Sequence, residues 1–99
     1  MKVFISQPFQ GRTEKEIFDE REQIITNLKK YIPEKEFDVI DQYHQTAPEG
    51  AVKLYYLSQD LLMMCEADLI VFAHDWKRAR GCRIENKVAT EYGMNIWYD

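Results

Sequence analysis

Cysteine is scarce in this sequence: the two residues present, Cys65 and Cys82, lie far apart and form no Cys-x-x-Cys pair. Two cysteines are too few for a disulfide framework, and their spacing does not match a zinc site. We therefore expect two reduced thiols, which is typical of a cytoplasmic protein. The sequence also predicts no metal site and no cofactor.

Long apolar runs are lacking as well. No stretch approaches the roughly 18 consecutive apolar residues that a membrane-spanning helix requires. The first ten residues, MKVFISQPFQ, contain one lysine and only a short apolar run, whereas a secretory signal peptide needs a longer one. We expect no membrane partner.

An excess of basic charge is the third feature that is missing. The chain carries 13 Lys and Arg against 17 Asp and Glu, a net charge of -4. Binding a nucleic-acid polymer through bulk charge requires a basic face, so we expect no such partner. The 99 residues, 45% of them hydrophobic, are enough for one domain with its own core, and we predict a single domain spanning residues 1–99.

Strand-like and helix-like segments alternate along the chain. Short β-branched and aromatic runs predict strands at 2–6, 37–41, 68–74 and 94–99. Helical periodicity predicts helices at 13–32, at 51–66 and in the segment that ends at Gly93. This order predicts right-handed crossovers and a small three-layer α/β domain with a parallel sheet of about four strands.

The predicted helices have recognisable starts and faces. Thr13 and Glu16 form a capping-box signature at the start of the first helix. The residues expected on the buried faces are Ile17, Phe18, Ile24, Ile25, Leu28 and Ile32 in the first helix, Val52, Tyr55, Tyr56, Leu61, Leu62 and Cys65 in the second, and Ile84, Val88, Ala89 and Tyr92 in the third.

Three polar loops follow the first three predicted strands. Their sequences are QPFQGRT, QYHQTAPEG and HDWKRARGC. Parallel α/β sheets bind ligands beyond the carboxyl ends of their strands, where the strand order reverses. We therefore expect a ligand cleft at these loops.

Two carboxylates are candidates for chemistry in that cleft. Glu85 follows the third strand and its loop, about one turn into a helix, whose N-terminus favours the ionised form. A positioned carboxylate of this kind can attack an anomeric carbon, although solvated glutamates are common in first turns. Asp60 lies at the edge of the buried face of the second helix and would face either the cleft or water. Two carboxylates in one cleft can divide the roles of nucleophile and acid.

A local basic cluster stands out against the acidic composition. Lys77, Arg78, Arg80 and Arg83 precede or begin the third helix, where a small-ligand phosphate would bind well. The alternative is a solvated basic loop. The segment with Gly11 and Arg12 offers a second anion position, but it matches neither a P-loop nor a dinucleotide fingerprint.

The remaining candidates are aromatic and imidazole side chains. Trp76 could stack on a base or cap the core. His74 ends the third predicted strand and is either structural or an edge of the cleft, while His44 lies in a loop beside Tyr43 and is expected to be exposed.

Three segments together resemble a known family. FISQPFQG at residues 4–11, DLLMMCEADLIVFAHDW at 60–76 and RGCRIENKVATEYG at 80–93 resemble the nucleoside 2-deoxyribosyltransferase-like superfamily, in particular its short DUF4406-type members. The resemblance implies a flavodoxin-like or Rossmann-like fold. It also implies cleavage or transfer at the N-glycosidic bond of a 2′-deoxynucleoside or its 5′-monophosphate, through a covalent deoxyribosyl-glutamate, and a homodimer or larger homo-oligomer.

The resemblance also implies roles for individual residues. Gly81 and Glu85 match a Gly-x-x-x-Glu pattern in which the glutamate is the nucleophile, and Asp60 matches an aspartate that orients the sugar or handles a proton of the base. Ala79 stands where nucleotide-cleaving members have a serine, so Arg78 or Arg80 would take over the phosphate contact. The residues expected to bind substrate are Ser6, Gln7, Pro8, Gly11, Arg12, Asp75, Trp76, Arg80 and Gly81.

Two alternatives to an enzyme remain at this point. One is a non-catalytic nucleotide-binding module with the same fold, and the other is an interaction protein with a degenerate pocket. Turnover of a nucleoside or nucleotide separates the first from an enzyme, and ligand-induced stabilisation separates it from the second.

Overall fold

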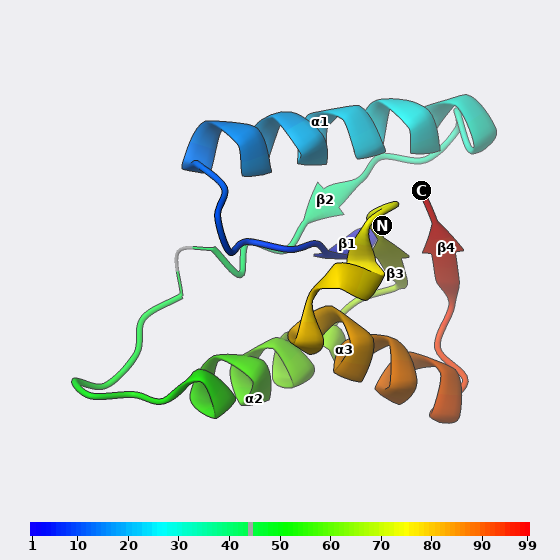
Figure 1. Cartoon of the computed structure of the whole chain (residues 1–99). Coiled ribbons are helices and arrows are strands. Elements are labelled where there is room, and N and C mark those ends of the chain that lie inside the picture. The colour runs from blue at the N-terminus through cyan, green and yellow to red at the C-terminus, as the bar shows by residue number, and fades with distance from the viewer. Residues whose placement is uncertain (44) are drawn as a thin grey trace.

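A computed structural model describes residues 1–43 and 45–99, and its elements alternate as the sequence predicts (Figure 1). The strand order in the sheet is β2-β1-β3-β4, with every neighbouring pair parallel. The elements are β1 (Lys2–Ser6), α1 (Glu14–Tyr31), β2 (Asp38–Val39), α2 (Lys53–Met64), β3 (Leu69–Phe72), the 3-10 turn η1 (Trp76–Arg78), α3 (Arg80–Glu91) and β4 (Ile96–Tyr98).

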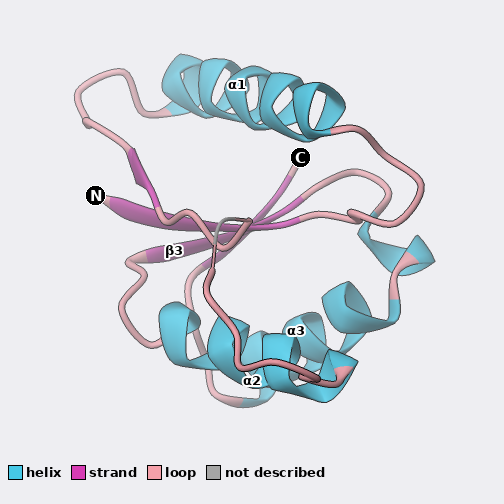
Figure 2. Cartoon of the chain, turned by 90° about the vertical axis from the view of Figure 1, so that its left-hand side faces the viewer, coloured by secondary structure: helices cyan, strands magenta, loops and turns pink. Residues whose placement is uncertain are grey.

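The sheet is the middle of three layers. Helix α1 covers one face, and α2 and α3 cover the other (Figure 2). Residues on β1 and β3 alternate between the two faces, so each face has its own buried apolar cluster. On the α1 side the cluster is Val3, Ile5, Ile24, Leu28, Leu69, Val71 and Ala73, and on the α2 and α3 side it is Phe4, Met64, Ile70, Phe72 and Ala89.

This arrangement confirms the predicted α/β class, with a small Rossmann-like or flavodoxin-like architecture. Three predicted strands are shorter in the structure, because only residues with a partner in the neighbouring strand form the ladder. The segment 37–41 contributes just the pairs Lys2 with Asp38 and Val3 with Val39. Within the part of the chain that the structure describes, none of the helices has the length and apolar character needed to cross a membrane.

Helix α1 begins as its sequence predicts. The Thr13 hydroxyl accepts a hydrogen bond from the Glu16 amide at 3.2 Å, and the Glu16 carboxylate accepts one from the Thr13 amide at 3.0 Å. This reciprocal pair satisfies two amides that the helix itself cannot. Of the predicted face, Ile17, Ile24 and Leu28 are fully buried, whereas Phe18 is half-buried.

The predicted buried faces of α2 and α3 need correction. In α2 the buried residue is Met64, while Leu62 is 63% exposed. In α3 the buried positions are Cys82, Glu85 and Ala89, and Tyr92 is 80% exposed. A glutamate takes the central buried position of α3, which no apolar pattern predicts.

Two boundaries of α2 and α3 also differ from the prediction. Helix α2 spans Lys53–Met64 rather than 51–66, with Val52 at its N-cap and 68% exposed. Helix α3 already begins at Arg80, so the glycine that follows is helical rather than part of a loop. The expected helix end is confirmed, since Gly93 has a φ of 66°, the left-handed conformation typical after a helix.

Candidate functional site

The strand order reverses between β1 and β3, which places a crevice at their carboxyl ends. The chain leaves β1 at Ser6 toward α1 on one face, and it leaves β3 at Phe72 toward α3 on the other face (Figures 1 and 2). Ser6 and Phe72 are register partners in the sheet. Residues of the two loops that diverge from this point, among them Gln7 and Arg78, line one cleft.

Glu85 lies at the base of this crevice and is almost completely buried, with 4% of its surface exposed. The Ser6 hydroxyl donates a hydrogen bond to Glu85 Oε1 at 2.7 Å. This bond joins the last residue of β1 to the second turn of α3 across 79 positions of sequence. The sheet therefore positions the carboxyl group directly, because the hydroxyl belongs to a strand.

Asp60 of α2 is the second carboxyl group at this position. It shares a hydrogen bond with Glu85, and the Gln45 side chain donates another to Asp60 Oδ1 at 3.0 Å. Two carboxyl groups can share a hydrogen bond only when one of them holds a proton. The structure thus brings together the two carboxylates that the sequence singled out, and it joins them as a pair.

Burial is the main reason that the pKa of Glu85 is raised to about 8. The hydrogen bond with Asp60 raises it further, and the Ser6 hydroxyl partly offsets both effects. Burial also raises the pKa of Asp60, while its hydrogen bonds to Glu85 and Gln45 lower it. Asp60 therefore ionises first, and near neutral pH the pair holds one proton on the Glu85 side.

This protonation reverses one expectation from the sequence. We predicted that the N-terminus of the helix would favour ionised Glu85. Glu85 is the sixth residue of α3, beyond the first turn in which that field acts. Removal of the side chain from water dominates instead.

The raised pKa of Glu85 predicts how stability depends on pH. Between pH 4.5 and about 8 the folded protein holds a proton that the unfolded chain releases, so the free energy of unfolding falls as pH rises through that window. Glutamine is neutral at every pH. Let the stability difference be the free energy of unfolding of Glu85→Gln minus that of the wild type, measured by urea denaturation. We expect this difference to increase by at least about 2 kcal/mol from pH 5 to pH 9.

A matched control is Glu91→Gln on the same helix, because the Glu91 side chain is 61% exposed and forms a surface ion pair with Lys87. The free energy of unfolding of that variant should lie within about 0.5 kcal/mol of the wild-type value at both pH 5 and pH 9. Parallel pH profiles for Glu85→Gln and the wild type would show that Glu85 is ionised in the folded protein throughout.

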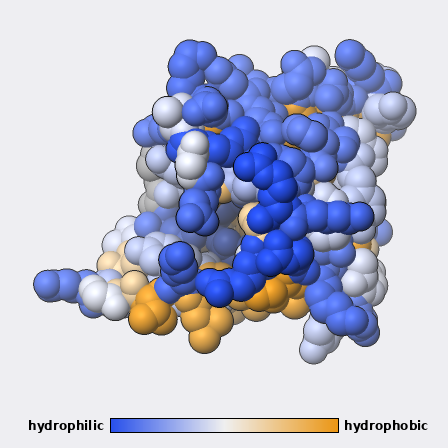
Figure 3. Space-filling model, viewed as in Figure 1, coloured by the Kyte–Doolittle hydropathy of each residue, from blue (hydrophilic) through white to orange (hydrophobic). Residues whose placement is uncertain are grey.

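The crevice opens into a cleft of about 920 Å³, large enough for a drug-sized ligand or a nucleotide. Figure 3 shows hydrophilic side chains around its rim and hydrophobic ones along the lower edge of this view, over α2. Of the predicted site residues, those that line the cleft are Gln7, Pro8, Asp60, Arg80, Gly81 and Glu85.

Other predicted site residues lie beside the cleft rather than on its wall. Arg12 donates to the Pro8 carbonyl at 3.1 Å and to Glu20 at 2.9 Å. Trp76 packs against Phe72 and Tyr98, with ring centroids 5.5 and 6.0 Å away, so it caps the core.

Three more predicted positions complete this outer group. Asp75 pairs with Arg78 at 3.2 Å. Gly11 has a φ of 78° and forms the turn before α1, a conformation that glycine adopts without strain. His74 is exposed, and His44 lies outside the described residues.

The basic cluster lies partly on the rim of the cleft. Arg78, Arg80 and Arg83 line it, and Lys53 faces it from the start of α2. Lys77 lies 5.5 Å from the centroid of the Trp76 ring instead. Four cationic side chains therefore surround an opening whose base carries a carboxyl pair.

Arg21 is a buried residue that holds two side chains of the cleft, and the sequence did not single it out. It is 4% exposed, and its guanidinium donates to Gln7 Oε1 at 2.7 Å, to Gln42 Oε1 at 3.2 Å and to Asp41 Oδ1 at 3.3 Å. Gln7 and Gln42 both line the cleft. Burial lowers the pKa of Arg21, and its bond to Asp41 opposes this. The available signal was its place in the apolar stripe of α1, four residues after Ile17 and three before Ile24.

The structure is that of a small parallel α/β protein with a buried carboxyl pair in the cleft at the switch point of its sheet. A family model described as a domain of unknown function, DUF4406, matches residues 1–98, and the chain belongs to this family. Comparisons with curated proteins and with solved structures give no match.

Proposed function

We propose that the protein cleaves or transfers the N-glycosidic bond of a 2′-deoxynucleoside or its 5′-monophosphate, as a member of the nucleoside 2-deoxyribosyltransferase-like superfamily. The observation that carries this proposal is the pair formed by Asp60 and Glu85 at the base of the cleft, with Ser6 fixing Glu85. Enzymes that act at an anomeric carbon usually use two positioned carboxyl groups with different pKa values.

The shared proton gives each carboxyl group a role. Glu85 passes its proton to Asp60, and its carboxylate oxygen bonds to C1′. The C1′–N bond breaks, its electron pair stays on the base nitrogen, and Asp60 protonates the leaving base. Water or a second base then attacks C1′, the bond from C1′ to Glu85 breaks, and Asp60 accepts the proton that the attacking group releases.

The rim of the cleft supports a negatively charged substrate. Arg80 and Arg83 lie in the first turn of α3, and Arg78 ends η1 just before it; guanidinium groups and free helix amides there favour a phosphate. Ala79, at the N-cap of α3, offers no side-chain hydrogen bond of its own. We therefore expect the 5′-monophosphates to be better substrates than the nucleosides.

The test is incubation of the full chain with a panel of deoxynucleosides and their 5′-monophosphates, scored for free base by chromatography. Release of one base, faster from the monophosphate, is the expected result. Ribonucleotides of the same bases serve as matched controls for the sugar. No release from any member of the panel would reject the enzymatic proposal.

One observation favours a second candidate function, a non-catalytic nucleotide-binding module. With a pKa of about 8, Glu85 is protonated at neutral pH in the free protein, and a protonated carboxyl group is a hydrogen-bond donor rather than a nucleophile. The binding module predicts a raised melting temperature with a deoxynucleotide and no product over hours. Stabilisation together with base release would favour the enzyme.

We further propose that the protein acts in the cytoplasm as a homo-oligomer. Helix α2 and its N-cap expose large apolar side chains, of which Leu54 also lines the cleft, and protein surfaces tend to cover such groups. Their exposed fractions are 68% for Val52, 69% for Leu54 and 63% for Leu62. Sedimentation velocity should show a species at least twice the mass of the chain, and a monomer at all concentrations would reject this proposal.

A further inference from the structure

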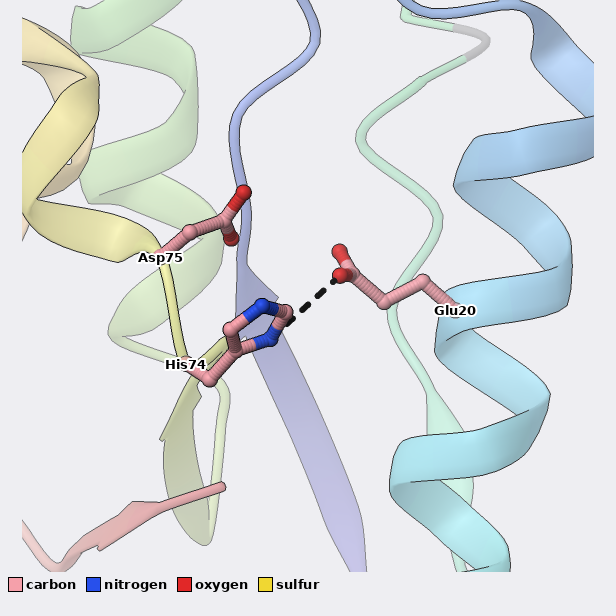
Figure 4. Close-up of side chains that lie close together, drawn as sticks. All are labelled: Glu20, His74 and Asp75. Carbon is pink, nitrogen blue, oxygen red and sulfur yellow. Dashed lines mark ion pairs between the residues drawn. The ribbon is translucent and has the colours of Figure 1, made fainter.

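A cluster of three potential ligands lies beside the cleft, and the proposed reaction does not use it. Glu20 comes from α1, whereas His74 and Asp75 follow β3 (Figure 4). One ligand atom from each residue lies within 4.8 Å of the others. Figure 4 shows the three side chains converging from the two elements. The cluster therefore joins segments that are more than fifty residues apart in the sequence.

Each carboxylate of this cluster has one oxygen held by an arginine. Glu20 Oε1 accepts from Arg12 at 2.9 Å and from Gln7 at 2.7 Å. Asp75 Oδ2 accepts from Arg78 at 3.2 Å. Such partners orient carboxylates and are typical of the groups that surround metal ligands.

The second oxygen of each carboxylate is left for another partner. Glu20 Oε2 lies 3.9 Å from His74 Nδ1, which is too far for a hydrogen bond. Asp75 Oδ1 is buried and has no hydrogen-bond partner among the described residues. A buried carboxylate oxygen without a partner is costly, and a cation is the partner that best satisfies it.

We propose that Glu20, His74 and Asp75 form a three-ligand site for a divalent first-row transition metal ion, with Zn²⁺ as the reference ion. One imidazole and two carboxylates favour such an ion over Mg²⁺ or Ca²⁺, which take oxygen ligands. Three protein ligands leave a coordination position for water or a ligand. This proposal does not depend on the proposed reaction.

The geometry requires only a small movement to bind the ion. Ligand atoms about 2.0–2.2 Å from a tetrahedral ion lie roughly 3.4 Å apart, so the present separations must close by up to about 1.5 Å. The His74 side chain is 71% exposed and can rotate, whereas Glu20 and Asp75 are 13% and 15% exposed and held by arginines. Two fixed carboxylates and one imidazole that can rotate are therefore sufficient to bring three ligand atoms to one ion.

The test is isothermal titration of the tag-free full chain with ZnCl₂, in a Cys65→Ser background that removes the exposed thiol. We expect one ion per chain, and at least a tenfold loss of affinity in His74→Ala and in Asp75→Asn. His44→Ala, which removes the other histidine of the chain, is the matched control and should bind as the parent does. Circular dichroism checks that each variant is folded.

The opposite results would overturn the proposal. Zn²⁺ that binds without saturation, or equally well to His74→Ala, would show that the cluster holds no ion. Loss of binding in His44→Ala alone would assign the ion to another site. MgCl₂ titrated into the same protein should bind at least tenfold more weakly than ZnCl₂, and an equal affinity would contradict the imidazole as a ligand.

Discussion

Replacing Glu85 with glutamine is expected to reduce base release by roughly 10³-fold or more, to the background of the assay. Glutamine has nearly the same shape, and its amide can still accept from Ser6 and donate to Asp60. The variant should therefore fold and bind, yet form no bond to C1′. Base release by chromatography, with thermal shift by the same deoxynucleotide, separates the loss of chemistry from a loss of binding.

Two controls sharpen this result. Glu91→Gln, an exposed change on the same helix, should keep the full rate. Asp60→Asn should slow release as well, because asparagine cannot donate a proton to the leaving base. Full activity in Glu85→Gln would disprove the nucleophile and leave the binding module as the better explanation of the cleft.

The shared proton also fixes the direction of the pH dependence of this reaction. Above about pH 8 the pair loses its proton, and the leaving base has no acid to protonate it. The rate of base release should therefore fall as pH rises beyond that value. A rate that still increases up to pH 10 would show that the ionised pair is the active form.

The second large effect is expected at Arg21. Arg21→Met keeps an unbranched side chain but removes the donors to Gln7, Gln42 and Asp41. Two buried amide oxygens then lose a partner, which costs far more than a surface contact. We expect the free energy of unfolding to fall by about 3 kcal/mol, measured by urea denaturation.

The control for Arg21→Met is Lys29→Met, an exposed cation on the same helix, which should change stability by less than about 0.5 kcal/mol. A buried arginine sometimes contributes little, since its removal from water offsets its hydrogen bonds. The partners decide the outcome here, because they remain buried after the substitution. A loss below about 1 kcal/mol would show that Gln7 and Gln42 find other donors.

The order of elements could be predicted because each element carries its own local signal. The run from Leu69 to Ala73 is apolar at every position and is buried at every position. The box formed by Thr13 and Glu16 marks the start of α1 in both sequence and structure. These features depend on neighbours in the chain, so sequence periodicity captures them.

The burial of charged groups could not be predicted in the same way. Glu85 and Arg21 have charged side chains, and a charged residue is usually exposed. Their burial depends on partners 79 and 14 positions away, namely Ser6 and Gln7. Such long-range pairing leaves no periodic signal. Asp60 and Glu85 belong to different helices, α2 and α3. Their pairing could be seen only when both helices were placed on the same side of the sheet (Figure 2).

The same limit explains the predicted positions that lie outside the cleft. Trp76 and Arg12 follow strand ends as a ligand-binding residue should. One nevertheless fills the core beside Phe72, and the other joins Glu20. Sequence position predicts the end of the sheet on which a residue lies, but not the direction in which its side chain points.

The outer strands of the sheet are very short, and this affects how copies of the protein meet. β2 contributes two residues and β4 three, so each border offers few unpaired backbone groups to a neighbouring chain. Acidic side chains, Asp38 and Asp99, stand at these borders. A second sheet that pairs with one of these edges therefore forms few backbone hydrogen bonds, and its own acidic side chains are repelled by those at the edge. Two copies of the protein can still associate through a helical face, whereas both edges of the sheet disfavour aggregation through strand pairing.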